Sequence, residues 1–303
     1  MILNTVIKQI ASLFIISVIG FYCGKKDIID ENFSNQLSKL LLEVTLPLLI
    51  ISSFSFTYER NIVDNIVKAF IYAVLIFTIT PLIVKPLLIK IGKEKRDVLQ
   101  FAMVFSNCGF MGFPITQSIF GNEGIIYASI FNMVFNIFVW TYGIMLFSEV
   151  KTIREVGKIL RNPGIISALI GILIMIFSIK VPSVLQDTMK AVGGLTTPIS
   201  MLIIGSLLSK SNFKNLINDV SMYYGSFIKL LFIPAALYIV SIFLKDNSIV
   251  MKTFILMQAM PAGATTSLFA ENFNKGKEYS VFIVSLSTLF SMATIPLIIK
   301  FCL

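Results

Sequence analysis

Residues 101–121 read FAMVFSNCGFMGFPITQSIFG and residues 254–273 read FILMQAMPAGATTSLFAENF, and these two stretches decide the fold. Both are apolar enough to lie in a bilayer, yet each contains a proline, Pro114 or Pro261, close to glycine. Proline removes a backbone donor and clashes with the preceding turn, while glycine lets the chain unwind. Broken backbone is tolerated at membrane depth only where protein or a water-filled cavity satisfies the freed polar groups. The two stretches therefore predict two interrupted membrane helices.

A second pair of prolines suggests that the chain consists of two related halves. Pro47 follows Thr45-Leu46 and Pro198 follows Thr196-Thr197, 151 residues later, while Pro114 and Pro261 are 147 residues apart. Both separations are close to half of the 303 residues. A single proline can be a plain kink, but matched pairs favour two copies of one unit. Interrupted helices at matching places of two inverted halves indicate the midplane site of a transporter.

The rest of the chain has the composition of a membrane protein. Apolar residues make up 56%, mean hydropathy is +0.88, and only 14% of residues are charged, against roughly 25% in soluble domains. This excludes a soluble enzyme, a disordered chain and a nucleic-acid-binding protein. The absence of histidine excludes His-based triads and His-ligated metals. Ten stretches are almost free of charge and, with their flanks, approach the roughly 20 residues that one crossing needs: 9–24, 44–58, 69–84, 98–122, 124–148, 162–179, 191–209, 220–244, 253–270 and 279–299.

The distribution of lysine and arginine predicts the orientation. Connections after odd-numbered spans hold sixteen of them, and the termini with the connections after even-numbered spans hold eight. Positive residues stay in the cytoplasm. We therefore expect a multi-pass protein of the cell (plasma) membrane with both termini extracytoplasmic. Two units of five spans each would then insert in opposite orientation.

The residues around the first break are similar to those of a known family. Ser106 to Pro114 (SNCGFMGFP) resembles the segment-4 signature of the auxin efflux carrier family, which has bacterial members and includes the plant PIN carriers. Further landmarks of that resemblance run in order along the chain: Arg161-Asn162-Pro163, residues 261–270, and Ser287 to Ser291 with Pro296.

The resemblance implies an all-α membrane protein with ten transmembrane helices in two inverted five-helix repeats, residues 1–150 and 151–303. The broken helices 4 and 9 would cross, as in the fold of bile-acid-type sodium symporters. Spans 1, 2, 6 and 7 would form a scaffold, and spans 3–5 and 8–10 a mobile bundle.

The resemblance also implies a function. Family members move organic anions such as auxin, malate or malonate, so we expect an efflux carrier that works by alternating access around a midplane site. No cofactor or metal is expected, and the driving force is the substrate gradient or coupling to H⁺ or Na⁺. The expected partners are a small organic anion, the lipid bilayer and, by analogy with plant relatives, a second copy in a homodimer. The alternative is an anion channel or a ligand-binding membrane sensor; an intramembrane enzyme lacks the necessary residues.

Helix ends at the breaks suggest where the anion binds. Half-helices beginning after Pro114 and Pro261 would present free N–H groups and positive dipole ends, and uncharged polar side chains gather there. Asn107 matches the asparagine of the family motif and would donate its amide to a carboxylate, or else cap the broken backbone. Ten residues are the substrate-binding candidates: Asn107, Gly109, Pro114, Thr116, Gln258, Pro261, Thr265, Thr266, Asn132 and Asn136.

Some of these candidates have a second interpretation. Gln258 is a ligand from the other half or a partner for backbone groups. Asn132 and Asn136 lie one helical turn apart and share a face, so they line the path or hydrogen-bond between helices. Lys229, alone in its apolar stretch, pairs with an acid, attracts anions or extends its side chain to the interface.

A coupling ion has its own candidates around the other pair of prolines. Glu43 is ionisable within a predicted span, which makes it a functional candidate by default. It could carry a proton or hold a cation with carbonyls freed near Pro47, or it could simply reach the membrane interface. The coupling-ion candidates are Glu43, Thr45, Pro47, Thr196 and Pro198.

Overall fold

The structure, a computed structural model, describes residues 2–54, 61–147, 162–177, 179–210 and 219–302, and in this part helices are joined by short loops and extended segments. Within these described residues, four π-helical segments are inserted among the α-helices. They are η1 (Leu41–Thr45), η2 (Cys108–Gly112), η3 (Val139–Gly143) and η5 (Ile228–Phe232). The α-helices are α1 (Ile2–Lys25), α2 (Glu31–Leu40), α3 (Leu46–Phe54), α4 (Asn61–Leu87), α5 (Lys93–Val104), α6 (Phe113–Phe138), α7 (Ile144–Phe147), α9 (Pro163–Ile176), α10 (Ser183–Gly194), α11 (Thr196–Lys210), α12 (Val220–Phe227), α13 (Ile233–Phe243), α14 (Ile249–Ala259), α15 (Thr265–Asn272) and α16 (Lys277–Cys302).

Six of the described helical stretches are long and apolar enough to cross a membrane. This supports the prediction of a helical membrane protein, whereas the arrangement as ten helices in two inverted repeats stays a prediction. The expected boundary at residue 150 lies outside the described residues. The six stretches are Glu31–Phe54, Asn65–Leu87, Cys108–Phe147, Ser183–Lys210, Val220–Phe243 and Lys277–Phe301; three shorter apolar helices are Ala11–Lys25, Pro163–Ile176 and Ile249–Ala259.

One of these stretches, Cys108–Phe147, is 40 residues long, about twice what one crossing needs. It is interrupted at Gly121, whose φ of 59° and ψ of −145° are not helical. A positive φ of this kind is open to glycine at little cost. The interruption falls beside residues 122–124, where the sequence predicts that one span ends and the next begins.

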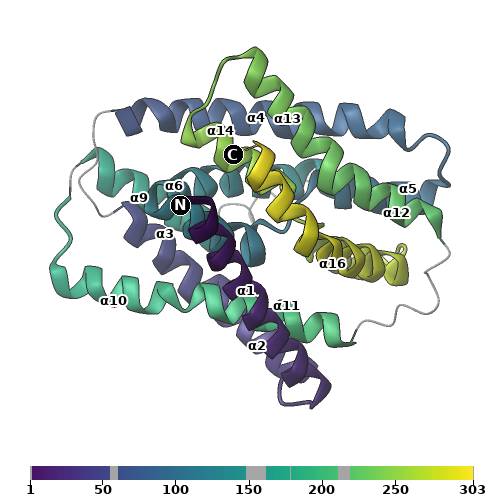
Figure 1. Ribbon diagram of the computed structural model, residues 1–303, viewed down its shortest axis with the longest axis horizontal. Coiled ribbons are helices and arrows are strands. Elements are labelled where there is room, and N and C mark those ends of the chain that lie inside the picture. Colours follow the sequence, from purple (N-terminus) through teal and green to yellow (C-terminus); the bar gives the residue numbers. More distant parts are fainter. Residues whose placement is uncertain (1, 55–60, 148–161, 178, 211–218, 303) are drawn as a thin grey trace.

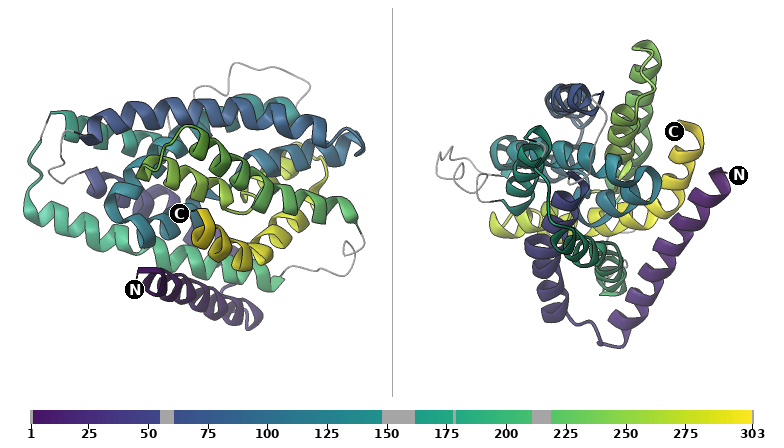
Figure 2. Two further views of the ribbon diagram at one scale, coloured as in Figure 1. Left: turned by 45° about the horizontal axis from the view of Figure 1, so that its top comes forward. Right: turned by 90° about the vertical axis from the view of Figure 1, so that its left-hand side faces the viewer.

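The outer surface is apolar. α4 lies along one edge of the molecule and α10 with α11 along the opposite edge, while α6 and α14 lie between them (Figures 1 and 2). Leu82 on α4 is 68% exposed and Phe243 on α13 is 82% exposed. Large apolar side chains exposed over several helices mark a surface that contacts something other than water. In a chain of this composition that surface is the lipid-facing one.

α1 crosses α11 at very short distance because glycines lie between the two helices (Figure 1). A Cβ atom added at Gly205 would lie 1.8 Å from the carbonyl oxygen of Ser17, and one added at Gly20 would lie 2.3 Å from that of Leu202. Small residues of this kind let membrane helices approach backbone to backbone.

Replacing Gly205 by valine should therefore separate α1 from α11 and destabilise the fold. The clash is with backbone, which cannot move aside, so we expect a loss of about 3 kcal/mol or more, in the range of severe overpacking. Size-exclusion chromatography and thermal melting in detergent measure it. Gly194→Ala is the control, since nothing lies within 4 Å of the added Cβ. A Gly205→Val protein that melts like the Gly194→Ala protein would contradict the close packing.

Two of the predicted interruptions are not open breaks. Glu31–Phe54 is one helical stretch, because η1 inserts an extra residue into the turn before Pro47. Only Leu195 separates α10 from α11. Pro198 lies in the first turn of α11, where a missing backbone donor costs little. Pro47 lies within a continuous helical stretch and cannot donate to the preceding turn, so a cation held by carbonyls freed there stays a prediction.

Candidate functional site

The two predicted breaks meet. α5 ends at Val104 and α14 ends at Ala259, and the extended segments after them lie antiparallel, with Ser106 opposite Ala262. The Asn107 amide donates to the Pro261 carbonyl at 2.8 Å, and the Gly263 amide donates to the Phe105 carbonyl at 3.0 Å. Each break thus satisfies backbone groups of the other, which is how unwound chain can persist away from water. The crossing expected from the sequence is present.

The position of the first break differs from the prediction. The second half-helix begins at Cys108, not after Pro114. Pro114 is buried at the second residue of α6, directly after η2, and therefore lies inside the continuing helix and not at the break. The break itself is produced upstream, around Asn107, whose side-chain oxygen accepts the Phe110 amide hydrogen at 3.2 Å and so caps the new helix.

A cavity of about 350 Å³ opens beside the crossing, which we call the amide cavity. Its size falls within the roughly 300–1,000 Å³ of small-molecule sites. Side chains of α3, α6, α9 and α15 meet there with both breaks. The lining residues are Leu42, Glu43, Leu46, Ser106, Asn107, Cys108, Gly109, Phe110, Asn132, Phe135, Asn136, Val139, Trp140, Asn162, Pro163, Gly164, Gly263, Ala264, Thr265, Leu268 and Phe269.

Two asparagines in this lining have amide groups free to bind a ligand. Asn107 and Asn132 are each only 7% exposed. The Asn107 amide nitrogen has no acceptor among the described residues, and the Asn132 side chain has no hydrogen-bond partner there. A buried amide without a hydrogen-bond partner costs free energy. Both groups are therefore suited to bind a ligand or water that fills the cavity.

The other two asparagines connect helices. Asn136 donates to the Asn132 carbonyl at 2.7 Å, and Asn162 donates to the Asn136 side-chain oxygen at 3.1 Å. Asn162 also caps α9 by accepting from the Gly164 amide at 2.9 Å. Asn136 therefore both lines the cavity and bonds between helices. The sequence marked Asn162 only as a landmark, although an Asn-Pro pair is a typical helix start.

Three helices begin at the amide cavity. η2 starts at Cys108, α9 at Pro163 and α15 at Thr265, and all three residues are in the lining. Helix N-termini carry partial positive charge and unpaired N–H groups, which favour anions. The lining contains no lysine or arginine, and Glu43 is its one charged side chain.

A cation lies behind one wall of the cavity. Lys229, in η5, is 2% exposed; its ammonium donates to the Ser106 hydroxyl at 2.5 Å and to the Gln258 side-chain oxygen at 3.1 Å. Ser106 also donates to that Gln258 oxygen at 3.2 Å. Among the described residues no carboxylate lies within 4.0 Å of the ammonium.

The structure thus contradicts two interpretations of Lys229, the extension to the interface and the pairing with an acid. The third, attraction of an anion, fits its place at the crossing. The sequence signal was a lone charged residue in the otherwise uncharged stretch 220–244. It could not tell the direction in which the side chain points.

The remaining substrate candidates lie outside the cavity lining, where their binding role stays a prediction. Gln258 is fully buried with Lys229, and Pro261 uses its carbonyl in the crossing. The Thr116 hydroxyl faces the Met257 sulfur at 3.7 Å. Thr266 is buried and its hydroxyl has no partner among the described residues. Gly109 and Thr265, by contrast, line the cavity.

The coupling-ion candidates separate into two groups. Thr196 donates to the Thr45 hydroxyl at 3.0 Å, which joins the matched positions of the two halves. Glu43 is exposed and lines the amide cavity, whereas Thr45, Thr196 and the two prolines do not. The five candidates therefore do not form one site.

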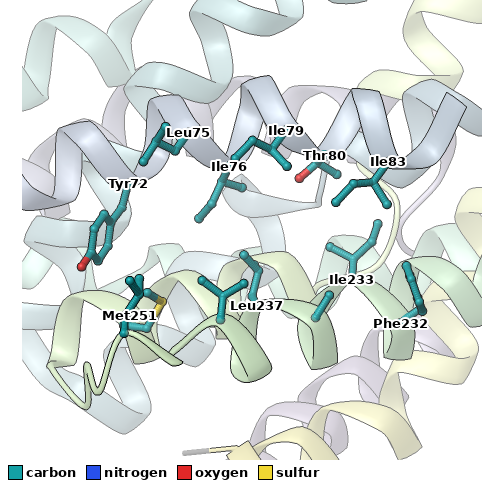
Figure 3. A pocket seen from close by; sticks show the side chains of 13 residues that line it. Tyr72, Leu75, Ile76, Ile79, Thr80, Ile83, Phe232, Ile233, Leu237 and Met251 are labelled. Carbon is teal, nitrogen blue, oxygen red and sulfur yellow. The ribbon is translucent and has the colours of Figure 1, made fainter. Parts of the chain in front are cut away.

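A second hollow, of about 170 Å³, lies between α4 and α13 on the lipid-facing surface (Figure 3). Leu75, Ile76 and Ile79 face Ile233 and Leu237 across it. Its wall offers almost no polar group to hold an anion, so the amide cavity is the candidate site.

An acidic group at the edge of this hollow is held ionised. Asp246 lies 2.7 Å from the Lys68 ammonium. Partial burial opposes ionisation, but hydrogen bonds from Lys68, Ser248 and Tyr72 outweigh it and lower the pKa of Asp246 to about 2. Its contribution to stability is present above the unfolded value near 4 and is lost only as the pH falls towards 2. Asp246 therefore does not titrate in the physiological range.

Comparison with known proteins finds similarity to membrane transporters over nearly the whole chain. A family model described as "Membrane transport protein" matches residues 5–158 and 152–299. An uncharacterized transporter of Methanocaldococcus jannaschii is 19% identical over 94% of this chain and 95% of its own length. One from Methanothermobacter thermautotrophicus is 22% identical, and the uncharacterized transporter YfdV of Escherichia coli is 18% identical, each over 96% of both chains.

Proposed function

Because the chain belongs to the membrane transport protein family, that of the auxin efflux carriers, we propose that it is a secondary carrier that moves a small organic carboxylate across the cell membrane. The family is one of transporters and not of enzymes. Malate, malonate and auxin-like acids are the substrate class that the resemblance implies.

One observation carries the proposal: the amide cavity combines free amide donors with three helix N-termini, and a buried ammonium lies behind its wall. Donors and positive dipole ends stabilise a carboxylate. A neutral ligand would gain little from Lys229, whose burial without a counter-charge is costly. An anion in the cavity supplies that counter-charge.

We propose that transport proceeds by alternating access, in a fold of ten helices arranged as two inverted repeats. Among the described residues, hydrogen bonds that join the helices of the expected scaffold to those of the expected mobile bundle include Asn162 to Asn136, and Thr197 to Gln117 at 3.2 Å. Both would break and reform as the bundle moves. The contacts at the crossing lie within the bundle and would move with the substrate.

Uptake by proteoliposomes tests the function. We expect saturable uptake of at least one radiolabelled acid among malate, malonate and an indole carboxylate, with and without imposed H⁺ and Na⁺ gradients. Liposomes without protein are the control. Flux that does not saturate would favour the channel, and folded protein that moves no anion of the panel would contradict the carrier.

Glu43→Gln tests the coupling ion. Glu43 is the one carboxylate in the lining of the amide cavity, which supports the proposal that it exchanges a proton or cation with the substrate path. If uptake depends on pH or on sodium, Glu43→Gln should remove that dependence, while Glu31→Gln on exposed α2 should keep it. Unchanged ion dependence in Glu43→Gln would make Glu43 structural only.

A further inference from the structure

The hollow between α4 and α13 is long, and its two ends differ. Figure 3 shows Tyr72 at one end and Ile83 with Phe232 at the other. Between Tyr72 and Ile83 the helix rises about 16 Å, which is about half the thickness of the hydrocarbon core of a bilayer. The hollow therefore has the length of one leaflet and can take one lipid acyl chain lengthwise.

The walls of this hollow face the lipid, whereas its deeper lining is buried. Leu75 on α4 is 48% exposed and Val240 on α13 is 45% exposed, while Ile76, Ile233 and Met251 are buried. An apolar hollow that opens towards the bilayer has no use for water, because burying its surface against hydrocarbon is favourable. An acyl chain satisfies the whole length of it.

Charged and polar groups gather at the Tyr72 end. The Tyr72 hydroxyl donates to Asp246 at 2.9 Å, and the Lys68 ammonium lies 2.7 Å from the same carboxylate oxygen. Lys68 also donates to the Ser248 hydroxyl at 3.2 Å. An ammonium has three donors, so one of those of Lys68 remains for a ligand.

The net charge at this end is positive. The described stretches 65–72 and 244–252 contain three lysines, Lys68, Lys245 and Lys252, and one acid, Asp246. Lys245 is exposed and directly follows a residue that lines the hollow, and so does Lys252, which is partly exposed. An anionic headgroup gains from each lysine near it. A zwitterionic headgroup, with no net charge, gains much less.

The opposite end lacks this excess of charge. Lys85, the next lysine along α4, comes two positions after Ile83, and two positions turn a helix by about 200°. It therefore lies on the other side of α4. Lys229, close in sequence to Phe232, directs its ammonium to the crossing. The hollow thus has one charged end and one apolar end, as a lipid has.

The rule that orients membrane proteins does not explain the lysines. Lys68, Lys245 and Lys252 are three of the eight basic residues that the sequence analysis assigns to the extracytoplasmic side. Positive residues are normally scarce on that side. Three of them at one end of one hollow therefore call for a local cause, and a negatively charged ligand provides it.

We propose that the hollow between α4 and α13 binds an anionic phospholipid. One acyl chain lies between the two helices, and the phosphate of the headgroup contacts Lys245, Lys252 and the free donor of Lys68. Because α4 belongs to the first half of the chain and α13 to the second, the lipid joins the two halves at their outer surface. The inference does not depend on which substrate the protein carries.

Native mass spectrometry of the purified protein in detergent tests the headgroup. The probes are dioleoyl phosphatidylglycerol and dioleoyl phosphatidylcholine, and the apparent dissociation constant of the tightest-bound lipid is measured for each. Wild-type protein should bind the glycerol lipid about tenfold more tightly or better. The double variant Lys245→Gln, Lys252→Gln should lose this preference. Lys180→Gln is the control, since Lys180 is exposed, is predicted on the same side and lies outside the hollow.

A matched pair of substitutions tests the acyl chain. Ala236 lines the hollow, whereas its neighbour Ala235 is exposed and does not. Ala236→Phe should fill the hollow and weaken binding of the glycerol lipid about tenfold, because the chain loses its place. Ala235→Phe adds the same ring outside the hollow and should bind like wild type. Both changes are on the lipid-facing side, and equal melting temperatures in detergent confirm that both variants are folded.

Three results would overturn the inference. The first is equal binding of the two lipids by wild-type protein, or a preference that survives in the double lysine variant. The second is equal binding by Ala236→Phe and Ala235→Phe, which would place the lipid elsewhere on the surface. The third is displacement of the glycerol lipid by an equal concentration of inorganic phosphate, since a site for phosphate alone needs no acyl chain.

Discussion

Lys229→Met should lower carboxylate uptake about 30-fold or more, the equivalent of about 2 kcal/mol of lost binding free energy, while the protein stays folded. The ammonium donates to Ser106, and the Ser106 side chain belongs to the lining of the amide cavity. An anion in that cavity interacts with the charge across one hydroxyl group, through surroundings of low dielectric constant. Methionine keeps a similar length and removes the charge together with the hydrogen bonds that the ammonium donates to Ser106 and Gln258.

The fold should survive this substitution because the ammonium is buried beside neutral partners. Replacing a buried charge by an apolar side chain of similar volume is often neutral or stabilising. The hydrogen bond from Ser106 to the Gln258 side-chain oxygen, at 3.2 Å, does not need the lysine and can persist. The melting temperature in detergent should therefore stay the same or rise.

The measurement is the initial rate of uptake against substrate concentration, with Lys90→Met as control. Lys90 is exposed after the end of α4 and lies outside the lining of the amide cavity, so its loss changes the net charge and nothing at the crossing. Equal uptake by Lys229→Met and wild-type protein would show that the buried charge has no part in anion binding.

The two breaks could be predicted from the sequence because their cause is local, whereas their crossing was implied by the family resemblance. Proline beside glycine in an apolar stretch has few structural outcomes, and two such stretches at matched positions leave few ways to satisfy the freed backbone. Asn132 and Asn136 were predicted because amides in a span must face something polar, and Asn107 because it matches the asparagine of the family motif. All three line the cavity.

The predictions that failed depend on packing that a sequence does not display. Pro114 does not mark the break, because the helix already begins at Cys108 and a π-helical turn leads into the proline. Pro47 leaves its helix continuous because a π-helical turn absorbs the strain. The direction of Lys229 depends on partners, Ser106 and Gln258, that lie 123 and 29 residues away in the chain.

The positions of the π-helical segments also could not be predicted from the pattern of apolar residues. Of the four in the described part of the chain, η1, η2 and η3 contribute residues to the amide cavity and η5 carries Lys229. A π-helical turn inserts one residue and rotates the next part of the helix, so it re-aims side chains without ending the helix. Periodicity averaged over a span does not detect one inserted residue.

Asn107→Ala should lower uptake by a similar factor, about 30-fold, since a hydrogen bond to a charged group contributes about 2 kcal/mol. The side chain does two things: its oxygen caps η2 through the Phe110 amide, and its nitrogen is free at the cavity. Loss of the cap alone costs about 1 kcal/mol of stability. Its own backbone amide still bonds to Pro261, so the crossing is kept.

Asn107→Ser separates the two roles. Serine is as good a helix cap as asparagine, so the Phe110 amide keeps an acceptor, but the free amide donor is lost and no charge is introduced. If Asn107 binds the substrate, uptake falls in both variants, although Asn107→Ser melts at the higher temperature. If Asn107 only caps the broken helix, Asn107→Ser transports like wild type. Asn35→Ala on exposed α2 controls for the loss of an amide elsewhere; the uptake by Asn107→Ser decides between a ligand and a cap.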